Sequence, residues 1–177
     1  MTKIFYTIGW NSEKNIGSYY NDFMKLLPDN AWMCAIDGDA MFTTVDFGKQ
    51  LELIIENYPE CGCFTAMTNR IGCLWQQQPG VLWDENNIDK HRKIGHSVQA
   101  SNYLTIQDVS HVPTEEVLGG VLILLSKKIW REIGGFKKTG LLGVDNDLHW
   151  KCMEHHKKVY LMKGVYLYHW YRWDDQW

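Results

Sequence analysis

The stretch that decides the fold is "AWMCAIDGDAMFTT", residues 31–44, where an apolar run ends in two aspartates. Residues 31–36 have the length of a strand and contain no charged residue, which is typical of a strand buried on both faces of a sheet. Asp37 and Asp39 follow directly, with Gly38 between them. An Asp-Gly pair between apolar segments indicates a hairpin turn, whereas two carboxylates beyond the end of a buried strand can hold a divalent cation. The stretch alone leaves both interpretations open.

The flanking segments alternate between strand and helix patterns. Apolar runs predict further strands at 3–8, 63–68, 117–125, 158–164 and 165–172. Apolar residues spaced by three or four predict helices that start near residues 12 and 47, and two more at 126–136 and 144–157. This alternation predicts an α/β fold with a mixed, mainly parallel sheet flanked by helices. No linker or internal repeat interrupts the pattern, so we expect residues 1–177 to form a single domain.

Two local features complete the expected layout. Asn11 or Ser12 is in position to cap the first helix, and Pro28 is expected to end it. Residues 70–116 show little periodicity, and we expect long loops there around one helix near 86–99. Loops of this length in a compact domain often form lids or binding surfaces.

The composition excludes several classes of protein. The net charge of −3 is too close to neutral for a nucleic-acid binder, and hydrophobic residues at 45% suit a globular core. The five cysteines form no CxxC pair and match no zinc-binding spacing, so free thiols in a reducing compartment are expected. There is no signal-peptide pattern, and the longest apolar run, 121–125, is too short to span a bilayer. We therefore expect a cytoplasmic protein without a transmembrane segment.

The order of motifs along the chain provides a family resemblance. In the first half, Asn15, Gly17 and Asn21 precede the strand that ends in Asp37 and Asp39. The second half, "GGVLILLSKKIWREIGGFKKTGLLGVDNDLHWK" at 119–151, runs from a glycine-containing strand through a Gly-Gly-Phe turn to an acidic segment. In this order and spacing, residues 4–48 and 117–172 resemble family 2 glycosyltransferases of the GT-A fold.

The resemblance implies metal-dependent transfer of a sugar, with inversion, from a UDP- or GDP-sugar to a hydroxyl of a glycan or other acceptor. Mn²⁺, or Mg²⁺, would be held by Asp37, Asp39 and the late histidine His169. Asp145 would be the base that deprotonates the acceptor hydroxyl, with Asp147 as its rival. The donor-binding half would span about 1–68 and the acceptor half about 69–177.

The remaining site residues follow from the same resemblance. Contacts with the donor are expected from Thr7, Gly9, Trp10, Asn15, Asn21, Asp37 and Gly38. Contacts with the acceptor are expected from Gly119, Gly120 and Trp170.

Two departures from the family pattern leave room for other functions. Val144 stands where the family carries an acidic residue before the base. Asp37 comes early in the sequence, so we expect the unit that recognises the nucleotide base to be shortened. A sugar-phosphate nucleotidylyltransferase would also use paired aspartates, although "TIGWNSEKN", residues 7–15, lacks the expected glycine-rich phosphate loop. A non-catalytic carbohydrate-binding module is the third alternative.

Overall fold

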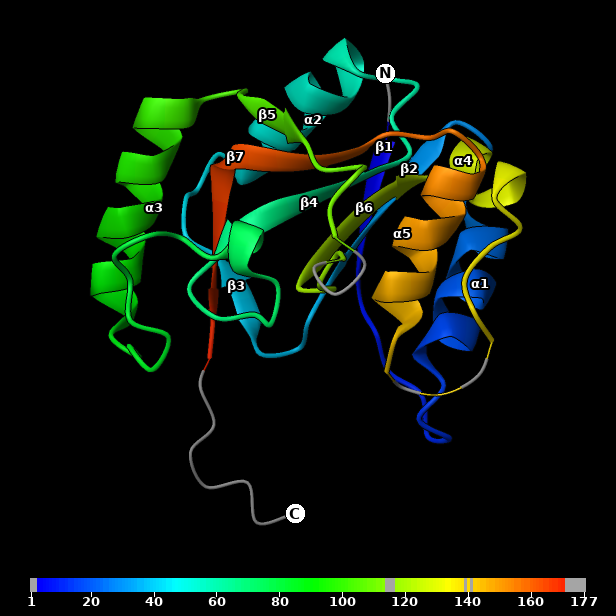
Figure 1. The fold of residues 1–177 in the computed structure, drawn as a ribbon, viewed down its shortest axis with the longest axis horizontal. Helices are drawn as coiled ribbons and strands as arrows, with labels where there is room; N and C mark the ends of the chain where they lie inside the picture. Colours follow the sequence, from blue (N-terminus) through cyan, green and yellow to red (C-terminus); the bar gives the residue numbers. More distant parts are fainter. Residues whose placement is uncertain (1–2, 114–116, 139, 141, 171–177) are drawn as a thin grey trace.

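Seven strands form one mixed sheet at the centre of the molecule (Figure 1). The computed structural model describes residues 3–113, 117–138, 140 and 142–170. Within them, the sheet has the order β1-β2-β6-β4-β7-β3, and the short strand β5 also pairs with β7. The strands are β1 (Lys3–Ile8), β2 (Ala31–Ile36), β3 (Ala40–Phe42), β4 (Cys63–Thr68), β5 (Ile106–Asp108), β6 (Leu122–Ser126) and β7 (Val159–His169).

The strand directions explain where the polar segments of the chain meet. β1 is parallel to β2 and β4 is parallel to β7, while β6 runs antiparallel between β2 and β4. β1, β2, β4 and β7 therefore share one direction, and β3 and β5 run antiparallel to β7. The expected mixed sheet is confirmed, and the carboxyl ends of β2, β4 and β7 lie along one edge of it.

Helices cover both faces of this sheet (Figure 1). The helices are α1 (Ile16–Leu26), α2 (Phe47–Asn57), α3 (Ile88–Asn102), α4 (Lys127–Glu132) and α5 (Val144–Glu154), with a 3₁₀ turn η1 (Leu74–Gln76). The apolar faces of α1, α4 and α5 share one core with Met33 of β2, and α2 shares a second core with Cys34 of the same strand. Successive side chains of a strand point to opposite faces, so β2 is apolar throughout because both of its faces are buried.

Outside residues 70–116, the predicted helices and strands are confirmed with three corrections, the first of which concerns the start of α1. Its cap is Asn15, whose side-chain oxygen accepts the N–H of Ser18, and not Asn11 or Ser12. The Asn11 side chain instead accepts the backbone N–H groups of Glu13 and Asn15, and so forms the turn that leads into the helix.

The other two corrections concern strands. The predicted strands at 158–164 and 165–172 are one strand, because β7 continues through Gly164 to His169; residues 171 and 172 of the second prediction lie outside the described part of the chain. A Cβ atom at Gly164 would lie 2.4 Å from the carbonyl oxygen of Asn102, so this glycine allows close packing and does not mark a turn. β6 begins at Leu122, later than predicted, because the backbone of Gly119 is hydrogen-bonded to the Gln76 side chain outside the sheet.

The described part of residues 70–116 contains η1, α3 and β5, so it is more ordered than the expected loops with one helix. All five cysteines are buried free thiols, as predicted. Among the helices of the described residues, none combines the length and the apolar character needed to cross a membrane.

Candidate active site

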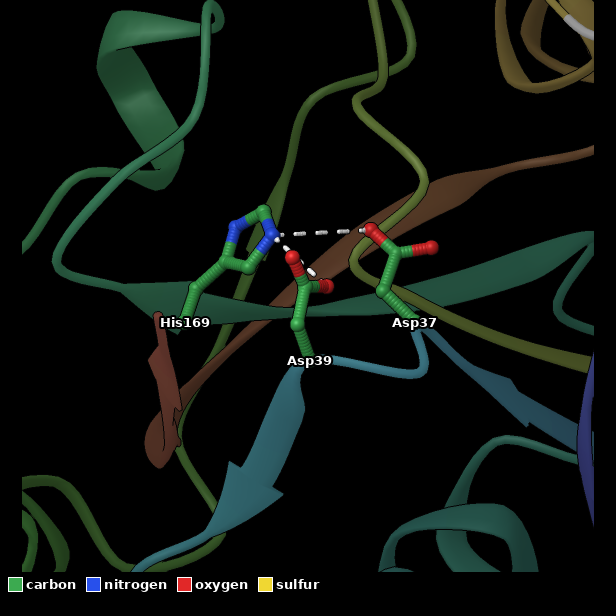
Figure 2. Close-up of side chains that lie close together, drawn as sticks. All are labelled: Asp37, Asp39 and His169. Atoms are coloured by element: carbon green, nitrogen blue, oxygen red, sulfur yellow. Dashed lines mark ion pairs between the residues drawn. The ribbon is translucent and has the colours of Figure 1, made fainter. Parts of the chain in front are cut away.

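Two strand ends bring the predicted metal ligands together (Figure 2). Asp37 and Asp39 lie in the short connection between β2 and β3, and His169 is the last residue of β7. β3 pairs with β7 so that Ala40 lies opposite His169, and the N–H of Trp170 donates to the carbonyl of Asp39. This register places the aspartate connection beside the histidine.

The connection is a tight turn, but it is not a hairpin. The N–H of Ala40 donates to the carbonyl of Asp37 at 3.1 Å, which closes the turn. β3 then pairs with β7 and not with β2, so the chain does not fold back on the strand it has just left. The turn and the cation site are therefore compatible interpretations of the same residues.

The three side chains converge on one point (Figure 2). Nε2 of His169 lies 3.2 Å from Oδ1 of Asp39 and 4.0 Å from Oδ2 of Asp37. One ligand atom from each residue lies within 4.8 Å of the other two. The group thus offers two carboxylate oxygens and one imidazole nitrogen to the same small volume.

Neighbouring groups fix the orientation of His169. Its Nδ1 lies 2.8 Å from the carbonyl oxygen of Arg70, and a carbonyl can only accept, so Nδ1 carries the hydrogen. The buried Asn69 side chain bonds the backbone of His169 twice, accepting its N–H at 2.8 Å and donating to its carbonyl at 3.0 Å. These contacts leave Nε2 as the ring nitrogen that faces the carboxylates.

The charge around His169 is negative. Burial alone would lower the pKa of its imidazole, but hydrogen bonding and the charges of the two aspartates outweigh burial and raise the pKa above its usual value. In its neutral form the imidazole offers Nε2 as one nitrogen ligand beside the oxygen ligands of the carboxylates. The hydrogen bond of Nδ1 with Arg70 orients the ring, as is usual for a metal-bound histidine. The residues present therefore fit a divalent cation such as Mn²⁺ or Mg²⁺.

The ligand group opens onto a cavity of about 830 Å³. A smaller hollow of about 410 Å³ adjoins it and shares part of its lining, including Asp37 and His169. Both volumes fall within or near the size range of small-molecule sites. Seven predicted site residues line the larger cavity: Gly9, Asp37, Gly38, Asp39, Gly120, Asp145 and His169.

The two candidate bases have different surroundings. Asp145 lines both hollows from the first turn of α5, and a Cβ atom at Gly120 would lie 3.2 Å from its Oδ2. Burial raises the pKa of Asp145, although backbone N–H groups, including that of Asn146, oppose the rise. Asp147 lines neither hollow, and its Oδ2 lies 2.9 Å from Nζ of Lys151 on the next turn. Of the two candidate bases, Asp145 is thus the one whose carboxylate lines the cavity.

Asn15 and Asn21, expected to contact the donor, join the two halves of the chain. The Asn15 amide donates to the carbonyl of Lys138. The buried Asn21 side chain accepts the N–H of Phe136 at 2.9 Å and donates to its carbonyl at 3.0 Å. Between them, a Cβ atom at Gly17 would lie 1.7 Å from the carbonyl oxygen of Lys137. The first motif therefore packs on the Gly-Gly-Phe turn, and neither asparagine lines the larger cavity.

The other predicted residues lie around the site. The Thr7 hydroxyl is paired with that of Tyr19 at 2.6 Å, and neither Thr7 nor the exposed Trp10 lines the larger cavity. Gly119 lines the smaller hollow, where the Gln76 side chain holds its backbone. Trp170 is half exposed and contributes its backbone N–H to Asp39.

Sequence reasoning missed Asn69, Arg70 and Tyr20 as residues of the site. Asn69 and Arg70 follow β4 directly, as the aspartates follow β2, so polar residues after a buried strand were an available signal. Arg70 and Trp83 both line the larger cavity, and the guanidinium lies 5.9 Å from the centre of the Trp83 ring. Tyr20 also lines it, but the helical spacing of Tyr20 indicated only a core position.

No protein-family model matches the chain, and no curated protein matches it either.

Proposed function

We propose that this protein is a metal-dependent glycosyltransferase of the GT-A type, which moves a sugar from a UDP- or GDP-sugar to an acceptor hydroxyl with inversion. The observation that carries the proposal is the shared cavity: the Asp37–Asp39–His169 group and the separate carboxylate of Asp145 line the same space. A transferase needs these two functions side by side, one for the departing diphosphate and one for the attacking hydroxyl.

The ligand group is suited to the donor. Asp37, Asp39 and His169 would hold Mn²⁺ or Mg²⁺, which as a Lewis acid would neutralise the charge that develops on the leaving diphosphate. Asn69 and the Arg70 carbonyl keep His169 in place before any substrate enters. The protein therefore does not need to reorganise this wall of the cavity during the reaction.

Asp145 is suited to the acceptor. Its carboxylate takes the proton of the acceptor hydroxyl while the hydroxyl oxygen bonds to the anomeric carbon and the bond from that carbon to the diphosphate breaks. Burial raises the pKa of Asp145, and a more basic carboxylate is a better proton acceptor. Attack on the face opposite the leaving group inverts the anomeric centre.

The test is hydrolysis or transfer of a panel of nucleotide-sugars. We expect the protein with MnCl₂ to release nucleoside diphosphate from at least one of UDP-glucose, UDP-galactose, UDP-N-acetylglucosamine and GDP-mannose. Asp39→Asn should abolish this release, because it removes a negative ligand without changing the volume of the side chain. Asp22→Asn is the matched control, since Asp22 lies on the exposed face of α1 and, among the described residues, pairs with Lys25 alone.

Three other outcomes would contradict the proposal, two of them by indicating an alternative function and one by rejecting the metal site. Exchange of pyrophosphate into a nucleotide-sugar would instead indicate a nucleotidylyltransferase. Glycan binding that needs neither metal nor nucleotide would indicate a carbohydrate-binding module. Release of diphosphate that persists in Asp39→Asn would show that the ligand group is not the metal site.

A further inference from the structure

Tyr20 lines the larger cavity, and its hydroxyl has no hydrogen-bond partner among the residues that the structure describes. Tyr20 belongs to α1, and its side chain is only 5% exposed, yet it lines the larger cavity together with Asp37 and Asp145. Among the described residues, no hydrogen bond involves its Oη, whereas the neighbouring Tyr19 hydroxyl is paired with Thr7. A hydroxyl on a residue this buried normally has a hydrogen-bond partner in the protein or in water, so this one is suited to a group that enters the cavity.

The ring of Tyr20 is held in place on several sides. Its centroid lies 5.2 Å from that of Phe136 and 5.9 Å from that of Tyr19. On the cavity side, a Cβ atom at Gly9 would lie 2.8 Å from Oη, so the backbone of Gly9 packs closely against the phenol. The absence of a side chain at residue 9 therefore makes room for the hydroxyl, which is held rigidly at the wall.

The charges around Oη determine what it can bind. Burial, followed by the charges of Asp37 and Asp145, raises the pKa of Tyr20 well above its usual value, so the hydroxyl keeps its proton and can donate. The same two carboxylates repel a phosphate group that approaches without a cation. A neutral hydroxyl suits this position better, because it can accept from Tyr20 and donate to a carboxylate at the same time.

We propose that Tyr20 Oη donates a hydrogen bond to a hydroxyl of the transferred sugar, so that this residue helps to select the sugar of the donor. The inference rests on the proposed function and adds a substrate contact to it. It predicts that Tyr20 matters for the sugar and not for the nucleoside diphosphate that carries it.

The experiment compares two pairs of probes by calorimetry with MnCl₂: UDP-glucose against UDP, and GDP-mannose against GDP. For the pair that the wild-type protein binds, Tyr20→Phe should weaken the nucleotide-sugar about 3- to 10-fold, the range expected for one neutral hydrogen bond, and leave the nucleoside diphosphate unchanged. The substitution keeps the ring and removes no hydrogen bond described within the protein. Tyr19→Phe is the matched control and should leave both affinities within twofold of the wild type.

Three results would overturn the proposal, and they differ from one another. Equal affinities of Tyr20→Phe and wild type for the nucleotide-sugar would reject the Tyr20 contact while the proposed function stands. An equal loss for both members of the pair would place the contact on the diphosphate or the nucleoside. If the wild type binds no member of either pair, the proposed function fails, and the Tyr20 contact fails with it.

A double-mutant cycle gives an independent check. Gly9→Ala should weaken nucleotide-sugar binding because its Cβ would displace Oη. In the Tyr20→Phe background the same change should cost less, since the displaced oxygen is no longer there. Additive losses would mean that Gly9 and Tyr20 act separately and would contradict the proposed arrangement.

Discussion

Replacing Asn69 tests how the fold positions the candidate metal ligand. Asn69 is 1% exposed and directly follows β4. Its side-chain amide accepts the backbone N–H of His169 and donates to the backbone carbonyl of the same residue. Asn69→Ala removes both bonds and leaves an N–H and a carbonyl without these partners. His169 itself is only partly buried, so water can replace some of what is lost.

The expected magnitude follows from those two bonds. A net contribution of about 1 kcal/mol each, plus part of the cost of an unsatisfied buried group, gives a destabilisation of about 2–3 kcal/mol. In a chain of this size, each kcal/mol lowers the melting temperature by roughly 2–4 °C, so Asn69→Ala should melt roughly 4–12 °C below the wild type. Its affinity for Mn²⁺ should fall about 10-fold, the lower end for a group that orients a metal ligand, because Asn69 holds the backbone and not the ring.

Thermal unfolding followed by circular dichroism, and calorimetric titration with MnCl₂, measure the two effects. Asn102→Ala is the control, because the one hydrogen bond of the Asn102 side chain within the described part of the chain goes to Val98 of the same helix, α3. This substitution should cost less than about 1 kcal/mol. If Asn69→Ala melts within 1–2 °C of the wild type, or binds Mn²⁺ equally well, the idea that Asn69 fixes His169 is wrong.

Three further predictions concern stability, activity and pH. Lys127→Met should destabilise the fold by about 2 kcal/mol, measured by urea titration, because the buried ammonium of Lys127 donates to two carbonyls at the end of α1. Lys25 is exposed, so the control Lys25→Met should change stability by less than about 1 kcal/mol. Asp145→Asn should lower kcat about 10²- to 10⁴-fold with little change in nucleotide affinity. Because burial raises the pKa of Asp145, the acidic limb of the wild-type pH–rate profile should lie above the usual carboxyl range. If the variant has the same rate and pH profile as the wild type, Asp145 is not the base. Although burial opposes ionisation of Asp108, hydrogen bonds from Lys158 and Ser110 lower its pKa to about 2. In an unfolded chain the pKa of an aspartate is about 3.9. The contribution of Asp108 to the stability of the fold is therefore complete above about pH 5 and is lost as the pH falls toward 2. Asp108→Asn should flatten that part of the stability–pH curve, and an unchanged curve would contradict the assignment.

The sequence predicted those helices and strands whose burial shows in the pattern of their own apolar residues. The run 31–36 is apolar at every position because both of its faces are covered, and the helical stripes of α1 and α2 are equally direct. The sequence also shows Asp37 and Asp39 directly after a buried strand, and the structure brings both of them close to His169.

The sequence could not predict features that depend on contacts between distant segments. β3 has three partly buried residues, too few for a pattern, and it exists because it pairs with the end of β7. Gly164 resembles a strand break until Asn102 is placed against it. Asn21 carries the same local signal whether it binds a nucleotide or Phe136, and only the packing of α1 on residues 136–138 distinguishes the two. The place of Tyr20 at the cavity could not be predicted, because its helical spacing indicates a core position.

The most direct test of the central claim is an anomalous diffraction experiment on crystals soaked with MnCl₂ and UDP, or GDP. We expect a manganese peak in contact with Asp39 and His169, beside Asp37, with the diphosphate on the cavity side of the ion. A diphosphate bound without manganese at these side chains, or manganese bound elsewhere while they keep their present positions, would contradict the claim.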